Sequence, residues 1–312
     1  MEFVPYAFCE KVVGILAEPS HMDGLKSPIW QRAVQNEASN RRNFDVFFGY
    51  TGEEWNLRIA KSNHFRTISL EELCNGPNKR HHRIVYIGIK HPILIQTLFD
   101  QFDPEKNFTM TLNFEELKKA VKRTLPFINM ATLRLNRSRD MQPAPLEPFL
   151  ELLSLYDTSS IREISVSADP LIASYEAILM KKMKTDSMKW ISVDQGPEIR
   201  ISAPLQSALA AFALENPHCG FDLDWKCAVF SREFFTQLFE SHVSGTFIGY
   251  FNFTLYDLEE FRKSSQVQTG TDLFSCSSFI TWNREDGVQV TVRDLDTDAG
   301  RRLEIDFNAL SA

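Results

Sequence analysis

One spacing of apolar residues recurs along the middle of the chain. Ile161, Ile164 and Val166 are separated by two positions and then by one, and the last two share a face of a strand because side chains alternate along it. Just before them, residues 146–156 carry apolar side chains at helical spacing. The same spacing as at Ile161, or a weaker form of it, starts at residues 84, 130, 188, 218 and 248.

Each interval between these copies holds one helix-like segment, and most intervals are about 30 residues long. A period of roughly 20–50 residues with one helix and one strand is typical of stacked repeats. The pattern therefore predicts an α/β fold, a leucine-rich-repeat-like stack of helix–strand units with a mainly parallel sheet. An ordinary α/β domain with evenly spaced strands is the alternative.

Other elements flank this array. Residues 2–18 and a segment that opens at Ser27 have the apolar spacing of two short helices, which must pack on something because short helices are not stable alone. Alternation over residues 44–59, interrupted by a turn, predicts an N-terminal β-hairpin. Residues 279–307 predict an antiparallel three-strand meander that closes the C-terminal edge of the array.

Composition and charge exclude several classes of protein. The 312 residues are 43% hydrophobic and carry a formal charge of −7, which disfavours broad binding to a phosphate backbone. No apolar run approaches the roughly 18–20 residues that span a bilayer. Five scattered cysteines, an odd number without a C-x-x-C pair, indicate reduced thiols. We therefore expect a cytoplasmic or nuclear protein that binds neither nucleic acid nor membrane.

The sequence shows little that indicates catalytic chemistry. The sequence carries no dinucleotide-binding, zinc-protease or serine-hydrolase motif. The basic run Lys79–Arg83 is expected to be a solvated turn, and its histidines, His81 and His82, are expected at the surface because they lack metal-site spacing. Cys219, next to His218, has no evident activating partner and is expected to be a buried structural thiol. We expect no enzymatic activity, no cofactor and no metal.

The polar positions of the strand copies alternate with the apolar ones and so share one side of the predicted sheet. Read across strands, they place Trp190, Gly220 and Tyr250 in one row and put Asn252 beside Asp222 in the next. If this side is open, the aromatics and carboxylates predict binding of a basic peptide or protein segment. If it is covered, the aromatics belong to a second core, and the sequence leaves both interpretations open. The partner-binding candidates are Trp190, Tyr250, Asp194, Asp222, Asp224, Glu163 and Arg134.

A family resemblance is carried by VPYAFCEKVVGIL, SPIWQRAVQNEASNRRNF, RIVYIGI, TLPFINMATLRL, MKWISV, REFFTQLFE, FTLYDLEEFRK and ITWNREDGVQVTV, which span nearly the whole chain. These segments resemble a large nematode-expanded family of F-box and F-box-associated proteins. Val4-Pro5 and the apolar residues after it match the start and first helix of an F-box, and Trp30 matches its late tryptophan. The chain differs from that pattern in reaching a strand by Phe44, without a third helix.

The resemblance implies a degenerate F-box-like helical segment over residues 1–40 and a repeat-like α/β F-box-associated domain over residues 41–312. It further implies a protein-interaction module that is a substrate receptor of a cullin–RING ubiquitin ligase, with the ligase adaptor and an unknown substrate as partners. The alternative is a binding or decoy protein of the same fold without that link. The adaptor-binding candidates are Pro5, Phe8, Val12 and Ile15.

Overall fold

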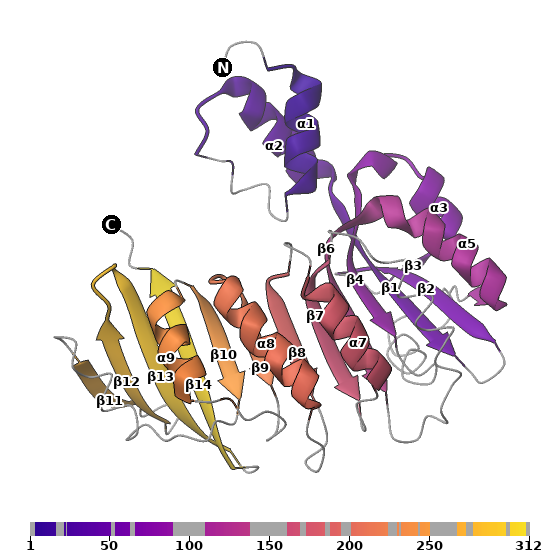
Figure 1. Cartoon of the computed structure of the whole chain (residues 1–312). Coiled ribbons are helices and arrows are strands. Elements are labelled where there is room, and N and C mark those ends of the chain that lie inside the picture. The colour runs from indigo at the N-terminus through magenta and orange to yellow at the C-terminus, as the bar shows by residue number, and fades with distance from the viewer. Residues whose placement is uncertain are drawn as a thin grey trace. The chain divides into compact units, whose positions relative to one another are not determined.

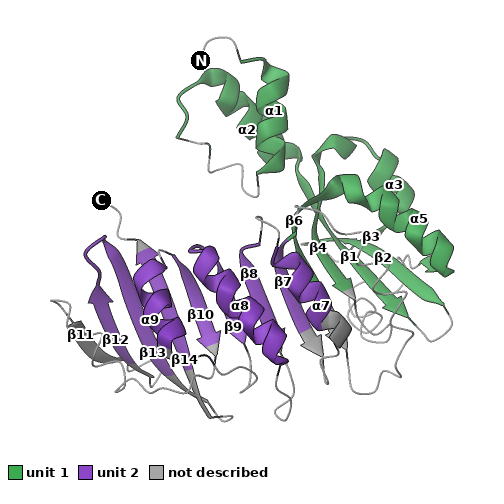
Figure 2. Ribbon diagram, in the orientation of Figure 1, with its two compact units in different colours: residues 1–136, 141–161 green, residues 137–140, 162–312 purple. Residues whose placement is uncertain are grey.

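The computed structural model describes the residues that carry colour in Figure 1. They fall into two compact units, residues 1–136 with 141–161 and residues 137–140 with 162–312 (Figure 2). The predicted division after residue 40 falls inside the first unit. The described residues are 4–16, 22, 24–50, 54–62, 66–89, 110–137, 161–168, 173–184, 188–194, 201–223, 230, 232–242, 244–249, 267–272, 277–297 and 300–309.

The first unit opens with two helices, as the apolar spacing predicts. Pro28 lies in the first turn of the second helix, where its missing N–H costs nothing. The elements of this unit are α1 (Tyr6–Ile15), α2 (Pro28–Asn40), β1 (Arg42–Tyr50), β2 (Trp55–Lys61), β3 (Thr67–Ile68), α3 (Leu70–Asn75), η2 (Lys79–His81), β4 (His82–Ile89), β5 (Met110–Leu112), α5 (Phe114–Thr124), η4 (Leu125–Phe127) and β6 (Ile128–Arg137).

The strands of the first unit are ordered β6-β4-β1-β2-β3, and β5 also pairs with β2. β1, β4 and β6 are parallel, whereas β1 and β2 form an antiparallel hairpin. Tyr50 lies opposite Trp55 and Phe44 opposite Lys61, so the predicted N-terminal hairpin is confirmed. The adjacent aromatic rings of Tyr50 and Trp55 are 4.9 Å apart, a close cross-strand pair.

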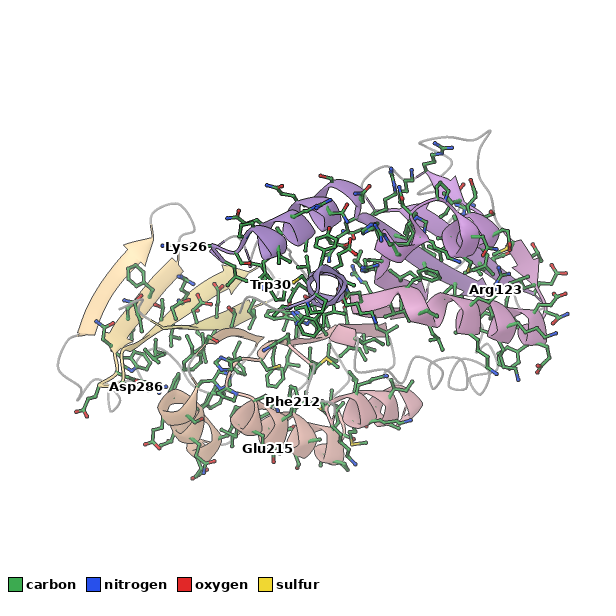
Figure 3. All side chains as sticks on the ribbon, turned by 90° about the horizontal axis from the view of Figure 1, so that it is seen from above. Lys26, Trp30, Arg123, Phe212, Glu215 and Asp286 are labelled. Carbon is green, nitrogen blue, oxygen red and sulfur yellow. The ribbon has the colours of Figure 1, made fainter. Side chains whose placement is uncertain are left out.

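The second unit begins with four parallel strands that neighbour one another in sequence order, as predicted. Ile164 lies beside Ile191, and Ile191 lies beside Phe221. Helices α7, α8 and α9 cover one face of these strands (Figures 1 and 3). The elements of this unit are β7 (Ile161–Ala168), α7 (Ala173–Lys182), β8 (Trp190–Asp194), α8 (Ala203–Glu215), β9 (Gly220–Leu223), α9 (Arg232–Ser241), β10 (Gly245–Gly249), β11 (Val267–Asp272), β12 (Ser277–Asn283), β13 (Val288–Thr297) and β14 (Gly300–Ala309).

Apolar side chains fill the space between these strands and helices. Ile164 and Ile191 are 0% exposed, as their alternation along the strands predicts. The ring of Phe221 lies 6.1 Å from that of Phe212 on α8. Figure 3 shows Phe212 on the strand-facing side of α8 and Glu215 on the opposite side. We call the helix-covered side of the second unit's strands the inner face and the other side the outer face.

An antiparallel meander completes the second unit, and it contains the three predicted strands together with β11, which was not predicted. β11, β12, β13 and β14 pair in that order, and β14 also pairs with β10. The last strand of the chain therefore continues the sheet from β10. Val290, Ile305 and Phe307 are at most 1% exposed, and the ring of Phe239 on α9 lies 6.2 Å from that of Phe307. The core of the inner face thus extends into the meander.

The register of β10 differs from the prediction. β10 pairs Ile248 with Asp222, whereas the predicted row puts Asn252 there, four residues later. In this register Thr246 is the residue of β10 in the row of Gly220, so the predicted row is wrong, and Tyr250 itself lies outside the described residues. Phe247 is the buried apolar residue of β10 and has glycines two positions away on either side, so the apolar spacing is too sparse to fix the register.

The architecture is mixed α/β, with mostly parallel central strands, antiparallel C-terminal strands and N-terminal helices. Residues 146–156, predicted to form the helix before β7, lie outside the described residues.

Candidate functional site

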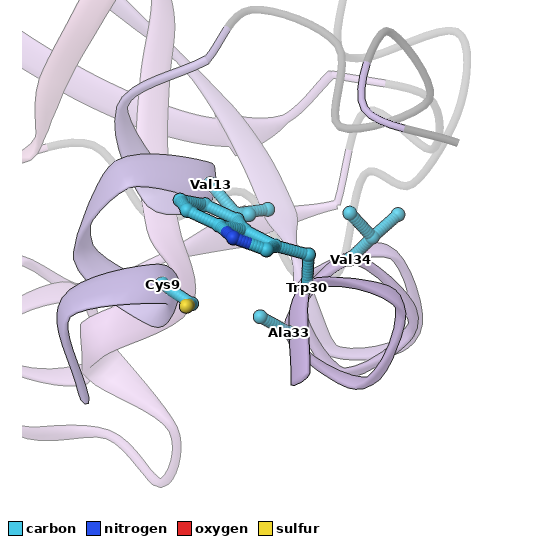
Figure 4. Packing of buried hydrophobic residues seen from close by; sticks show 5 residues of the cluster. All are labelled: Cys9, Val13, Trp30, Ala33 and Val34. Carbon is cyan, nitrogen blue, oxygen red and sulfur yellow. The ribbon is translucent and has the colours of Figure 1, made fainter. Parts of the chain in front are cut away.

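The α1–α2 helix pair has a small apolar cluster of its own. Trp30 of α2 packs against Cys9 and Val13 of α1, next to Ala33 and Val34 (Figure 4). These five side chains are between 0% and 9% exposed. Two helices of this length stabilise each other through such a cluster because neither would persist alone in water.

Part of the helix pair's apolar surface is not buried in this cluster. Phe8 is 53% exposed, Ile15 is 63% exposed and Ile29 of α2 is 37% exposed. Phe8, Val12 and Ile15 have the spacing of one helical face, and Val12 is half-buried against the cluster. Pro5, at the N-cap of α1, is exposed. We call Phe8, Val12 and Ile15 the apolar strip of α1.

A buried carboxylate ties the helix pair to the start of β4. Glu37 is 4% exposed, and its oxygens lie 3.0 Å from Arg41 Nε, 2.6 Å from His81 Nδ1 and 3.1 Å from Arg83 Nη2. We call these four residues the Glu37 cluster. Burial lowers the pKa of Arg83, an effect that the charge of Glu37 opposes. Two cations around one carboxylate offset the cost of removing its charge from water.

The same arginines bind the C-terminal end of α1. Arg83 Nε donates to the Gly14 carbonyl at 2.9 Å, Arg41 Nη2 donates to the Val13 carbonyl at 3.3 Å, and Asn129 of β6 also donates to Gly14. Carbonyls at this end of a helix lack intrahelical donors and attract cations. A Cβ on Gly14 would lie 2.9 Å from Arg83 Nη2, so the close approach favours glycine. The Glu37 cluster therefore orients both helices.

The basic run Lys79–Arg83 is a structural element rather than a solvated turn. Its first two residues are exposed, but His81 and His82 are each 4% exposed, so the predicted surface position of these histidines is wrong. His82 Nδ1 lies 2.8 Å from the Leu73 carbonyl, and burial lowers the pKa of His82. His81 Nε2 accepts from Arg80 Nε at 3.0 Å, whereas Nδ1 pairs with Glu37, which is 44 residues earlier and could not be identified from local sequence.

A polar groove of about 460 Å³ lies between α1, α2 and η2. Asn36 Nδ2 donates to Glu10 Oε1 at 2.8 Å, Arg80 Nη2 lies 3.7 Å from the same oxygen, and the guanidinium of Arg32 lies 5.3 Å from the centre of the Tyr6 ring. Because its charged groups already interact with one another, the groove is a weaker candidate than the apolar strip. Its lining is Tyr6, Glu10, Arg32, Gln35, Asn36, Ser39, Asn40 and Arg80.

The outer face of the second unit carries part of the predicted partner-binding row. Glu163, Trp190 and Gly220 lie side by side on β7, β8 and β9, and Asp222 follows in the next row. Glu163 is exposed, whereas Trp190 and Asp222 are half-buried. The side chains of Asp194, Asp224 and Tyr250 lie outside the described part of the chain, and Arg134 is an exposed residue of β6 in the first unit.

The indole of Trp190 covers Gly220. A Cβ at Gly220 would lie 2.4 Å from both Cε3 and Cζ3 of Trp190, and 2.9 Å from the Thr246 carbonyl. The ring therefore occupies the space that a side chain at position 220 would need. This contact holds the indole across β9 on the outer face.

Residues of β10 and the meander extend this face, although the repeated spacing did not identify them. Thr246 lies opposite Asp306, and Ile248 lies opposite Glu304. Thr246 Oγ1 donates to Asp306 Oδ1 at 2.8 Å, and Arg293 of β13 contacts Asp306 and lies 3.5 Å from Glu304. Alternation along β14 indicates which of its side chains share a face, but not that β14 lies beside β10.

The inner core contains a buried thiol and a buried histidine. Cys219 is 1% exposed, as predicted, and burial raises its pKa to about 12, so it is protonated at neutral pH. His242 Nε2 lies 3.2 Å from the Cys219 carbonyl, and the rings of Phe247 and Phe307 pack against the imidazole. Burial lowers the pKa of His242 to about 4, which keeps the imidazole neutral.

The described geometry thus offers two candidate surfaces, the apolar strip of α1 and the outer face of the second unit. Within the described ranges, no three histidine, cysteine, aspartate or glutamate side chains are grouped as a metal site requires. No helix among these residues combines the length and apolar character needed to cross a membrane. Comparison with protein-family models, curated proteins and solved structures finds no match to this chain.

Proposed function

We propose that the protein is a substrate receptor of a cullin–RING ubiquitin ligase and that its α1–α2 helix pair docks the ligase adaptor. The observation that carries the proposal is the exposure of Phe8 and Ile15, at 53% and 63%, on a helix pair that has its own core. Covering each such side chain contributes up to about 1.5–3 kcal/mol. The F-box resemblance supplies the identity of the occupant.

The attachment of the helix pair suits this role. Arg41 and Arg83 hold the end of α1, and Glu37 holds both arginines, so the apolar strip is presented in one orientation. A surface that is already ordered loses less conformational entropy when a partner binds. The Glu37 cluster therefore supports adaptor docking without contacting the adaptor itself.

The second unit supplies a separate surface for a substrate. We propose that its parallel strands and helices are units of a leucine-rich-repeat-like stack, a conclusion supported by the sequence-order pairing of β7, β8, β9 and β10. In such stacks each unit contacts mainly its neighbours, and the extended surface that results is used for binding.

The adaptor proposal is tested by titrating purified ligase adaptor onto the full chain. Wild type is expected to bind at micromolar concentration or tighter, and the double variant Phe8→Ala/Ile15→Ala to bind at least about tenfold more weakly. Lys119→Ala, an exposed change on α5, is the control and is expected to bind like wild type. Melting temperatures should be unchanged in all variants, because the altered positions are exposed.

Failure of wild type to bind the adaptor, or equal binding by the double variant, would exclude the ligase role.

One observation favours a second function, that of a binding or decoy protein without a ligase link. β1 begins at Arg42, directly after α2 ends at Asn40, so the described residues before β1 contain two α-helices where an F-box has three. In that case the helix pair would contact no adaptor, and the outer face would be the functional surface.

A further inference from the structure

We propose that the polar groove between α1, α2 and η2 binds a phosphorylated serine or threonine residue of a protein segment. The groove has a volume of about 460 Å³, and all of its lining side chains are polar or charged. On α1, Tyr6 and Glu10 line the groove, whereas Phe8 and Val12 belong to the apolar strip. Residues two positions apart do not share a face of a helix, so the groove is a second site, separate from the surface assigned to the adaptor.

Arg32 of α2 presents hydrogen-bond donors to the groove. Its guanidinium carbon lies 5.3 Å from the centre of the Tyr6 ring, and the side chain is exposed. Within the described part of the chain, no oxygen or nitrogen atom accepts a hydrogen bond from this guanidinium. Arginine carries five N–H donors in a planar fork that matches the oxygens of a phosphate group. Arg32 can therefore bind a phosphate without breaking an existing hydrogen bond.

Arg80 of η2 is the second arginine of the groove, and the Glu37 cluster orients it. Its Nε donates to His81 Nε2 at 3.0 Å, and His81 Nδ1 lies 2.6 Å from a carboxylate oxygen of Glu37. Its Nη2 lies 3.7 Å from Glu10 Oε1, and neither Nη atom donates a hydrogen bond to another described residue. The side chain is 66% exposed. Its outer N–H groups are therefore held in place and remain accessible to a ligand.

The charge of the lining favours an anion. Arg32 and Arg80 supply two positive charges and Glu10 one negative charge, which leaves a net charge of +1, and pairing among them does not change this sum. The adjoining Glu37 cluster holds two arginines around one carboxylate, so it adds no negative excess. A phosphorylated side chain carries a charge of about −1.5 to −2 at pH 7 and three acceptor oxygens, which suits two guanidinium groups better than a single carboxylate does.

The open, polar lining favours a side chain of a protein segment over a small molecule. Pockets for small molecules are lined mostly by apolar side chains and bury most of the ligand. In this groove Arg32, Gln35 and Ser39 are exposed, and Gln35 and Ser39 add neutral hydrogen-bonding groups. A phosphorylated side chain can enter such a groove while the backbone that carries it stays in contact with water.

The test uses the full chain without adaptor and a fluorescent pentapeptide that has phosphoserine at its centre between alanine and glycine residues. The same peptide with serine or glutamate at the centre is the control probe. Wild type is expected to bind the phosphopeptide about tenfold more tightly than the serine peptide and about fivefold more tightly than the glutamate peptide, because hydrogen bonds between charged groups are the stronger ones. Binding of the phosphopeptide should weaken as salt increases.

Two variants change the charge of the groove in opposite directions. Arg32→Gln should weaken binding of the phosphopeptide by about tenfold, and its melting temperature should be unchanged because Arg32 is exposed. Glu10→Gln removes the negative charge of the lining and should strengthen binding by about threefold. Lys11→Gln is the matched control, because it removes one positive charge from an exposed position of α1 outside the lining, and it should alter affinity by less than about twofold.

Failure of wild type to bind the phosphopeptide would overturn the proposal, as would equal binding of either control peptide. Unchanged binding by Arg32→Gln, or an equal loss in Lys11→Gln, would place the peptide elsewhere on the chain. Displacement of the phosphopeptide by an equal concentration of inorganic phosphate would show that the groove holds the free anion and not a protein segment. Adaptor binding is measured separately and depends on Phe8 and Ile15, so either proposal can fail alone.

Discussion

The α1–α2 helix pair and the helices of the second unit are held by different interactions. The helix pair combines a five-residue apolar cluster with the buried charges of the Glu37 cluster. In the second unit, helices contact strands through aromatic rings such as Phe212 on Phe221 and Phe239 on Phe307. Apolar burial stabilises in proportion to area, whereas a buried ion pair contributes direction more than net stability.

The core of the second unit stabilises the fold, whereas the Glu37 cluster positions the α1–α2 helix pair. The large core keeps the second unit folded. The Glu37 cluster sets the orientation of α1 and α2 while Phe8 and Ile15 stay exposed. Elements with few buried apolar contacts open at lower free energy than a core. The helix pair should therefore open locally before the second unit unfolds.

The largest expected effect comes from making the same substitution in the two regions. Phe221 is 2% exposed and Phe8 is 53% exposed. Phe221→Ala should lower the free energy of unfolding by about 3–5 kcal/mol, because it leaves a cavity in the inner core. Phe8→Ala should change it by less than about 0.5 kcal/mol. Chemical denaturation of both variants measures this contrast, and similar losses would show that the two regions are not held differently.

Many elements of the two regions could be predicted from the local sequence pattern, but the contacts of the Glu37 cluster could not. Alternation and regular intervals identified the first hairpin and the order of β7 to β10, because both depend on short stretches of sequence. The Glu37 cluster depends on residues 41, 81 and 83, which meet only after β4 pairs with β1. The apolar spacing of α1 identified a face, but it gave no information on what covers that face.

The outer face, too, could be predicted only in part from the sequence. The row of Glu163, Trp190 and Gly220 was predicted correctly from spacing, since each strand there has two or more buried apolar residues to set its register. β10 has Phe247 between glycines, and its register could not be inferred in that way. The contribution of Asp306 and Glu304 required the position of β14 beside β10, which is a long-range contact.

A smaller effect should appear on acidification, and the buried His242 of the inner core should contribute much of it. His242 has a pKa of about 4 in the folded chain, below its ordinary value of 6.5. The unfolded chain therefore takes up a proton first as pH falls from 6.5 towards 4, and stability decreases over that range. At pH 5 the expected loss is about 2 kcal/mol relative to pH 7.

Chemical denaturation at pH 7 and at pH 5 measures this loss in the free energy of unfolding. His242→Gln should reduce the pH-dependent loss, whereas His218→Gln, a change at an exposed histidine, should retain most of it, because burial is the larger cause of the low pKa of His242 and the charge of His218 is a smaller one. An undiminished loss in His242→Gln would assign the pH dependence to other groups.

The most direct test of the separation between positioning and stability is hydrogen exchange on Glu37→Gln. The neutral amide keeps the size of the side chain but cannot balance Arg41 and Arg83. The amides of α1 and α2 should then exchange faster than in wild type, while those of β8 and β9 keep their protection. Unchanged protection in α1 and α2, or an equal loss in β8 and β9, would contradict the role assigned to the Glu37 cluster.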